Sequence, residues 1–276
     1  VSVFDAMEGR RIATANLGNE VTYASFSHDG SKIAVTTYDR DAGQAVVKIL
    51  DALTLQTIEE ARVGAYGGAI SADFAPGDQS VLIATFEGFV SLWDIGPLRS
   101  RLDLGNSNAR TYRATFSADG RSIISASDNG IVSIWNADDG QRKIATPIGK
   151  AREFNSVPTA VFSPDALQFA VGWGGLLSLW DATVGRRMAA IDVCLGGHVE
   201  TIAFAPSGTE ILVGCRNGAY VYDIAQFVGG DLPALACRRL AADNSLTDTL
   251  TQFGLSTVPP ICGENAPVPV DGSKLQ

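Results

Sequence analysis

Short apolar stretches alternate with polar turns along most of the chain, and the stretches recur at a nearly constant spacing. Five of them end in a bulky apolar residue followed by Asp or Asn: Ile49-Leu50-Asp51, Leu92-Trp93-Asp94, Ile134-Trp135-Asn136, Leu179-Trp180-Asp181 and Val221-Tyr222-Asp223. A sixth, Val3-Phe4-Asp5, lies at the start, and successive endings are 46, 43, 42, 45 and 42 residues apart. A period just over 40 residues indicates a repeat architecture.

Each period has the same internal pattern of four short strands. A first strand ends in Phe and a small residue: Phe26-Ser27, Phe74-Ala75, Phe116-Ser117, Phe162-Ser163 and Phe204-Ala205. A turn rich in Asp, Gly, Pro and Ser follows, then a second strand, a second turn with Gly, and the third strand with its acidic end. A more polar fourth strand, such as Arg142–Ala145, completes the period. This pattern predicts an all-β propeller of four-stranded blades.

These motifs resemble WD40 repeats. Phe-Ser-x-Asp-Gly, the Gly197-His198 pair and Leu-Trp-Asp are typical of that family, and the resemblance covers roughly residues 1–224. It implies a propeller that binds proteins. In this family a structural tetrad links the His of Gly-His, a turn Asp, a Ser or Thr and the Trp. No repeat here has all four. The repeat with His198 has Tyr222 in place of the Trp and lacks the turn Asp, and the repeat with Asp128 and Trp135 lacks the His. We therefore expect rigidity to come mainly from apolar stacking of blades.

The first residues do not begin a repeat. Val1–Asp5 reads as a third strand and Arg10–Leu17 as a fourth, so residues 1–224 contain about five full blades and one incomplete blade. A ring of five blades lies within the known range. We favour the alternative that these blades are part of a larger ring of about seven.

The periodic pattern stops after Asp223, and residues 225–276 form a separate tail. Asp231-Leu232-Pro233 is a good helix start, a second short helix is predicted from Thr247 to Phe253, and the end is extended. Cys237 and Cys262 bracket this tail, and we expect them to lie close together and to form a disulfide under oxidising conditions. Cys194 and Cys215 are expected to pack as thiols.

Part of the tail also carries a resemblance. Ala236–Cys262, with Ala-Cys-Arg-Arg-Leu, Phe-Gly-Leu and Pro-x-Cys in order, resembles the end piece that follows WD40 arrays in bacterial multidomain signalling proteins. Those proteins place the propeller behind a STAND-type nucleotide-binding module, a TIR domain, a caspase-like protease or a Ser/Thr kinase. The resemblance implies the sensing or regulatory end of such a protein.

The charge of the chain and its reactive residues disfavour several classes of function. The net charge of −9 argues against nucleic acid and anionic membranes, and the apolar runs are too short for a membrane-spanning helix. The chain has two His, and it lacks metal-ligand, nucleophile-elbow and phosphate-loop motifs. We therefore expect no catalysis, no cofactor and no bound metal, and a cytoplasmic location.

The remaining reading is recognition of a protein partner through one rim of the propeller. Exposed aromatic residues and Arg are typical of binding hot spots. The positions leading into first strands or lying in second turns supply six candidates: Trp173, Tyr112, Arg216, Glu200, Phe86 and Tyr38. The alternatives are a stand-alone scaffold subunit and an enzyme-type propeller, which the lack of a ligand ring disfavours.

Overall fold

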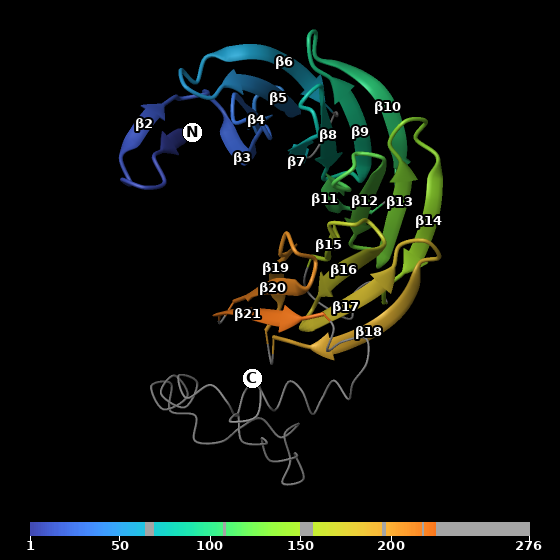
Figure 1. The fold of residues 1–276 in the computed structure, drawn as a ribbon. Helices are drawn as coiled ribbons and strands as arrows, with labels where there is room; N and C mark the ends of the chain where they lie inside the picture. The colour runs from blue at the N-terminus through green and yellow to red at the C-terminus, as the bar shows by residue number, and fades with distance from the viewer. Residues whose placement is uncertain (64–68, 107–108, 150–156, 195–196, 217, 225–276) are drawn as a thin grey trace.

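The chain folds into an open arc of β-sheets arranged around a common axis (Figure 1). This computed structural model describes residues 1–63, 69–106, 109–149, 157–194, 197–216 and 218–224, and within them every regular element is a strand. The prediction of an all-β propeller is confirmed. The predicted tail helices and the Cys237–Cys262 pair lie outside the described residues.

Four sheets have four strands each, ordered as in the sequence from the axis outward. Blade 1 contains β3 (Glu20–Phe26), β4 (Lys32–Asp39), β5 (Gln44–Asp51) and β6 (Thr57–Val63). Blade 2 contains β7 (Ala69–Phe74), β8 (Ser80–Thr85), β9 (Phe89–Asp94) and β10 (Arg99–Asn106). Blade 3 contains β11 (Thr111–Phe116), β12 (Ser122–Ser127), β13 (Ile131–Asn136) and β14 (Arg142–Pro147). Blade 4 contains β15 (Thr159–Phe162), β16 (Gln168–Trp173), β17 (Leu176–Asp181) and β18 (Arg186–Asp192).

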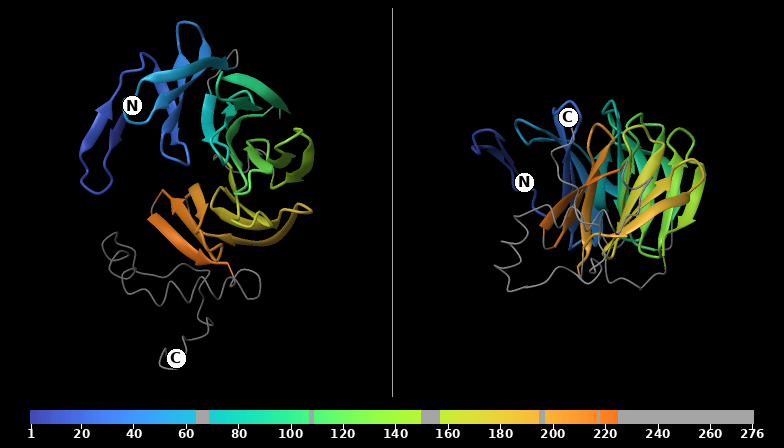
Figure 2. Two further views of the ribbon diagram at one scale, coloured as in Figure 1. Left: turned by 45° about the horizontal axis from the view of Figure 1, so that its top comes forward. Right: turned by 60° about the horizontal axis from the view of Figure 1, so that its bottom comes forward.

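The two ends of the arc are smaller sheets. Blade 5 has three described strands, β19 (Val199–Phe204), β20 (Glu210–Cys215) and β21 (Gly218–Asp223). The first residues form an antiparallel hairpin of β1 (Ser2–Phe4) and β2 (Arg11–Thr14), as predicted for a third and a fourth strand. Among the described strands, β1 and β2 pair only with each other and not with blade 5. The hairpin and blade 5 flank the gap in the arc (Figure 2).

Serine and aspartate fix the turn between the first and second strands. In the β3–β4 turn the Ser27 hydroxyl donates to Asp29 at 2.7 Å and accepts the Lys32 N–H at 2.8 Å. The same pair of bonds recurs with Ser117 and Asp119, and with Ser163 and Asp165. Each turn thereby satisfies backbone groups that the strands leave unpaired, which explains why Phe-Ser-x-Asp recurs.

The hydrophobic core is divided among the interfaces between blades. One face of each blade packs against the next blade, as when Leu82 and Leu92 of blade 2 pack with Ala114 and Ile123 of blade 3. Similar clusters lie between blades 1 and 2, 3 and 4, and 4 and 5. A fifth cluster joins the hairpin to blade 1. Apolar stacking between blades therefore supplies the core, in agreement with the sequence prediction.

Polar contacts supplement this stacking at the edges. The Asp78 carboxylate of blade 2 accepts the backbone N–H groups of His28 and Asp29 at 2.9 and 3.0 Å, and lies 3.0 Å from His28 Nδ1. Burial alone would raise the pKa of Asp78, but the hydrogen bonds from the His28 and Asp29 N–H groups outweigh it and lower the pKa. His28 therefore has a structural partner in the neighbouring blade.

The Ser–Asp turns should make the stability of the fold depend on pH. The Ser27 hydroxyl, followed by the Ser31 N–H and hydroxyl, lowers the pKa of Asp29 to about 2. Since the folded pKa lies below the unfolded value of about 3.9, the carboxylate stabilises the fold above pH 4, and this contribution disappears as the pH falls through 2. We expect Asp29→Asn to lower the urea midpoint at pH 5 and to flatten its decline from pH 5 to 2. The exposed Asp138→Asn is the control, and an equal flattening there would contradict the assignment.

Candidate protein-binding surface

An aromatic and cationic cluster lies where blade 2 meets blade 3. Phe86, in the β8–β9 turn, and Tyr112, in β11, are both half-buried, and their rings meet edge to face with centroids 6.2 Å apart. The Arg110 guanidinium lies over the Phe86 ring, 4.3 Å from its centroid. An edge-to-face pair contributes about 0.5–1.5 kcal/mol and a surface cation–π contact about 0.5–1 kcal/mol, so the cluster is held in place without being buried. We call Phe86, Arg110 and Tyr112 the turn-face cluster.

Asp128 anchors Arg110 from the next turn. Its carboxylate accepts the Arg110 backbone N–H at 3.0 Å and lies 4.0 Å from the Arg110 Nε, while its own N–H donates to the Arg110 carbonyl at 2.9 Å. The Arg110 side chain is still 53% exposed. A partner can therefore reach the guanidinium of Arg110, while the backbone of that residue is already held in place by Asp128.

Of the six predicted residues, the structure brings Phe86 and Tyr112 into contact with each other. Tyr38 is half-buried at the end of β4 in blade 1, whereas Glu200 and Arg216 are exposed at the β19 start and the β20–β21 turn of blade 5. Arg110 was not among the predicted residues. Its position two residues before Tyr112, in the segment leading into a first strand, was the available signal.

Trp173 does not have the exposure that was expected of it. Only 4% of its surface is accessible, because the ring packs over the glycines that follow blade 3 and lie in its second turn. A Cβ on Gly149 would lie 2.6 Å from the Trp173 ring, and one on Gly130 would lie 2.9 Å from it. The extra Trp thus fills the space between blades 3 and 4, where glycines permit a close approach.

Cys194 and Cys215 form a disulfide, which corrects the expectation that they pack as thiols. Cys194 lies in the segment that joins β18 to β19, Cys215 ends β20, and their Cα atoms are 5.7 Å apart. The Val199–Cys215 pairing in the β19–β20 register brings Cys215 beside this connecting segment. The bond ties the connection between blades 4 and 5 to the turn that carries Arg216.

The structural tetrad is incomplete, as the sequence suggested. The His198 Nδ1 atom is buried and has no hydrogen-bond partner among the described residues. In blade 3 the Trp135 indole N–H donates to Ser125 at 3.2 Å, whereas Asp128 is engaged with Arg110. The Trp93 and Trp180 indoles donate at 2.8 Å to Ser91 and Ser178 within their own strands.

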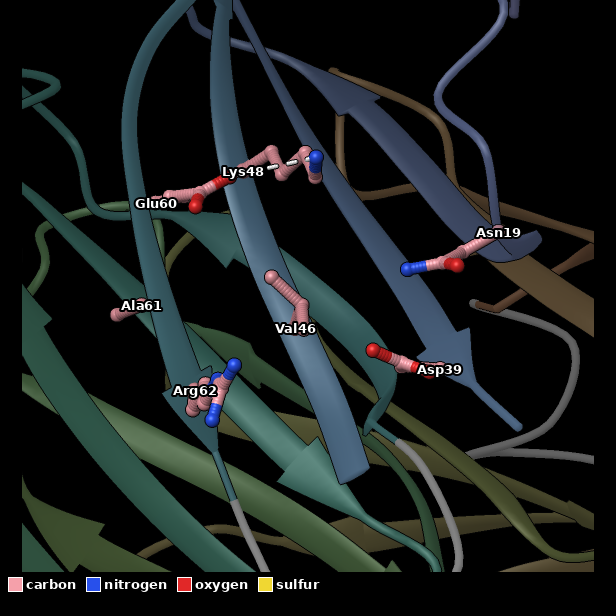
Figure 3. A pocket seen from close by; sticks show the side chains of 7 residues that line it. All are labelled: Asn19, Asp39, Val46, Lys48, Glu60, Ala61 and Arg62. Atoms are coloured by element: carbon pink, nitrogen blue, oxygen red, sulfur yellow. Dashed lines mark ion pairs between the residues drawn. The ribbon is translucent and has the colours of Figure 1, made fainter. Parts of the chain in front are cut away.

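A small pocket is lined by residues of blade 1 and by Asn19, which precedes its first strand (Figure 3). Its volume is about 180 Å³, and charged side chains dominate its lining, including the Lys48–Glu60 ion pair at 3.3 Å. Ligand sites usually enclose about 300–1,000 Å³, so this pocket is too small for a typical organic ligand. Elsewhere in the described part of the chain, no three His, Cys, Asp or Glu side chains converge in a metal-binding arrangement. Nor do the described residues include a helix able to cross a membrane.

Comparison with known proteins agrees with the blade geometry. Residues 104–136, which span the end of β10 through β13, match the family model for the WD domain, G-beta repeat. Residues 104–136 therefore contain a WD40 repeat, and the chain has the β-propeller fold. A chain in the crystal structure of the mitotic checkpoint complex superposes on this chain with a TM-score of 0.67 at 18% identity, over 80% of this chain and 69% of that one. The Myceliophteria thermophila Cps50 (Swd1) β-propeller domain superposes with a TM-score of 0.66 at 16% identity, over 77% and 68%.

The curated relatives of this chain are much longer proteins. It is 26% identical to rat (Rattus norvegicus) telomerase protein component 1 over 216 residues, which are 77% of this chain and 8% of that protein. It is 27% identical to mouse (Mus musculus) apoptotic protease-activating factor 1 over 199 residues, or 70% of this chain and 15% of that protein. The similarity therefore concerns one region of each relative.

The disulfide should stabilise the propeller measurably. Cross-linking two cysteines 21 residues apart removes loop entropy from the unfolded chain worth about 3 kcal/mol. In a Cys237→Ser, Cys262→Ser background, we expect Cys215→Ser to lower the free energy of unfolding by about that amount. Reductant should destabilise the background chain and leave the Cys215→Ser chain unchanged. Two reactive thiols in the folded, air-oxidised background chain would instead show that the bond does not form.

Proposed function

We propose that this WD40 domain is a non-catalytic protein-recognition module that binds its partner through the turn-face cluster. The observation that carries the proposal is the contact of Arg110 and Tyr112 with Phe86, which presents two aromatic rings and a guanidinium together. Tyr and Arg are among the residues that contribute most to protein interfaces, and prior ordering reduces the entropy cost of binding.

The chemistry of the described residues supports binding over catalysis. Of the two imidazoles, His28 contacts Asp78 of the next blade, and the Nδ1 atom of His198 is buried. The names of two relatives, a component of telomerase and an activating factor for a protease, are those of proteins that work with other proteins. An enzyme-type propeller is the weakest of the three candidate functions.

The wider context of the domain is part of the same proposal. We place it at the sensing or regulatory end of a bacterial multidomain signalling protein, on the resemblance of Ala236–Cys262, with a stand-alone scaffold subunit as the second candidate. A cytoplasmic location implies that the Cys194–Cys215 pair is reduced in the cell, because cytosolic disulfides are rare.

The test compares capture of proteins by matched variants. Immobilised wild-type chain, Tyr112→Ala, Arg110→Ala and two controls on exposed first turns, Leu167→Ala and Arg121→Ala, are incubated with lysate of the source cells. Captured proteins are quantified by mass spectrometry after each variant is shown to be folded. Loss of a hot-spot contact worth about 2 kcal/mol should weaken capture of the specific partner about 30-fold.

The two control variants, Leu167→Ala and Arg121→Ala, distinguish binding at the turn-face cluster from binding at the first turns. Both controls should retain the partner that the two cluster variants lose. If Tyr112→Ala and Arg110→Ala capture every specific protein as well as the wild-type chain does, the turn-face cluster is not the binding surface. Hydrolytic or redox turnover by the purified chain would contradict the non-catalytic assignment.

A further inference from the structure

The Cys194–Cys215 disulfide joins two sites that the fold holds in different ways, and Cys194 is the more firmly held. The carbonyl of Gly175, in the β16–β17 turn of blade 4, accepts the N–H groups of Val193 and Cys194 at 2.8 and 3.1 Å. The Cys194 carbonyl in turn accepts the Gly197 N–H at 2.7 Å. The Cys194 side chain is 1% exposed and belongs to the apolar cluster between blades 4 and 5. Cys194 is therefore fixed to blade 4 by its backbone and enclosed by its neighbours.

Cys215 is the accessible member of the pair. It is the last residue of β20, lies at the edge of the same apolar cluster and is half-buried. Besides its bond to Cys194, its Sγ atom lies 3.8 Å from the Val193 carbonyl. Arg216, which follows it, is exposed. A reagent in solvent therefore reaches the sulfur of Cys215 more easily than the sulfur of Cys194.

Two other blades carry a hydroxyl where blade 5 carries Cys215. Thr85 and Ser127 end the second strands of blades 2 and 3, as Cys215 ends that of blade 5. The Thr85 hydroxyl accepts the Phe89 N–H at 3.2 Å, and the Ser127 hydroxyl lies 2.9 Å from the Thr111 hydroxyl, so both bond within their own blade. A hydroxyl at this position is thus compatible with a folded blade, whereas the sulfur of blade 5 bonds to the segment that connects it to blade 4.

We propose that Cys215 is a site of reversible thiol modification by a low-molecular-weight disulfide, that Cys194 resolves the adduct, and that the resulting bond restrains the turn after β20. With glutathione disulfide, the Cys215 thiolate attacks one sulfur, forms a mixed disulfide and releases one glutathione. The Cys194 thiolate then attacks the Cys215 sulfur, expels the second glutathione and closes the internal bond. Two electrons pass from the cysteines to the small disulfide, and the two thiol protons end on the two glutathione molecules.

The order of these steps follows from access and distance. Thiol–disulfide exchange depends on access to the attacking sulfur, which favours Cys215 in the first step. The Cα atoms of Cys194 and Cys215 are 5.7 Å apart, within the usual range for a disulfide, so the second step needs no backbone rearrangement. Oxidation thereby ties the turn that begins at Arg216 to a segment already fixed to blade 4, and reduction releases it. This inference is independent of the turn-face cluster.

The test uses glutathione disulfide as the probe and reduced, folded chains in the Cys237→Ser, Cys262→Ser background. Mass spectrometry of intact chains follows the background, Cys194→Ser and Cys215→Ser. We expect the Cys194→Ser chain to gain glutathione roughly ten-fold faster than the Cys215→Ser chain, because only Cys215 is accessible. The background chain should proceed to the internal disulfide without accumulating the adduct. In concentrated urea the two single variants should react at the same rate.

Equal rates in the folded single variants, or a faster reaction at Cys194, would overturn the proposal. A stable adduct on the background chain would also overturn it, because Cys194 would then not resolve the adduct. So would a rate difference that persists in urea, where access is equal. If Cys194→Ser disturbs folding, acid quenching of the background chain at short times gives the same answer. Peptide mapping should then find glutathione on Cys215, and glutathione on Cys194 would contradict the assignment.

Trypsin cleavage after Arg216 reports separately on restraint of the turn. We expect reduction of the background chain to raise the rate of this cleavage roughly five-fold, because a cross-link beside the cleavage site opposes the local opening that proteolysis requires. The Cys215→Ser chain should be cleaved at the faster rate with or without reductant. Cleavage after Arg121, in the first turn of blade 3, is the control and should not change. Cleavage after Arg216 that is unchanged by reduction would show that the bond does not restrain the turn.

Discussion

The structure depends on the fact that a blade has two apolar faces and cannot bury either one by itself. Hydrogen bonds within a blade align its strands, but they leave residues such as Leu82 and Leu92 on one face and Phe74 on the other. Only stacking removes these side chains from water, at about 25 cal/mol for each Å² of apolar surface. The arc is the consequence, since each blade must be covered on both sides by its neighbours.

Features that repeat could be predicted from the sequence, because they follow from strand periodicity and turn chemistry. The four-stranded period, the Ser–Asp turns and the hairpin at the start were all visible in the spacing of Phe-Ser and Trp-Asp motifs. Features that depend on a contact between repeats could not be read in this way. Trp173 looked like an exposed anchor, but Gly149 and Gly130 leave room for its ring between blades.

The same limit applies to the disulfide and to the candidate surface. Cys194 and Cys215 belong to different parts of the repeat, and only the β19–β20 register shows that they meet. Phe86 and Tyr112 were identified as candidates individually, yet their contact across a blade boundary and the role of Arg110 required coordinates. What the repeat does not encode is the identity of the partner, since a surface cluster can vary while the stacked faces stay apolar.

Hydrogen exchange of the β12 and β20 amides tests most directly whether stacking, rather than strand pairing, holds the blades. Both strands are hydrogen-bonded on two sides, β12 to β11 and β13, and β20 to β19 and β21. They differ because β12 is covered by blades on both faces, whereas Leu212 of β20 is exposed. We expect the β20 amides to exchange at least ten-fold faster than those of β12. Equal protection of the two strands would show that pairing within a blade is sufficient and would contradict the account.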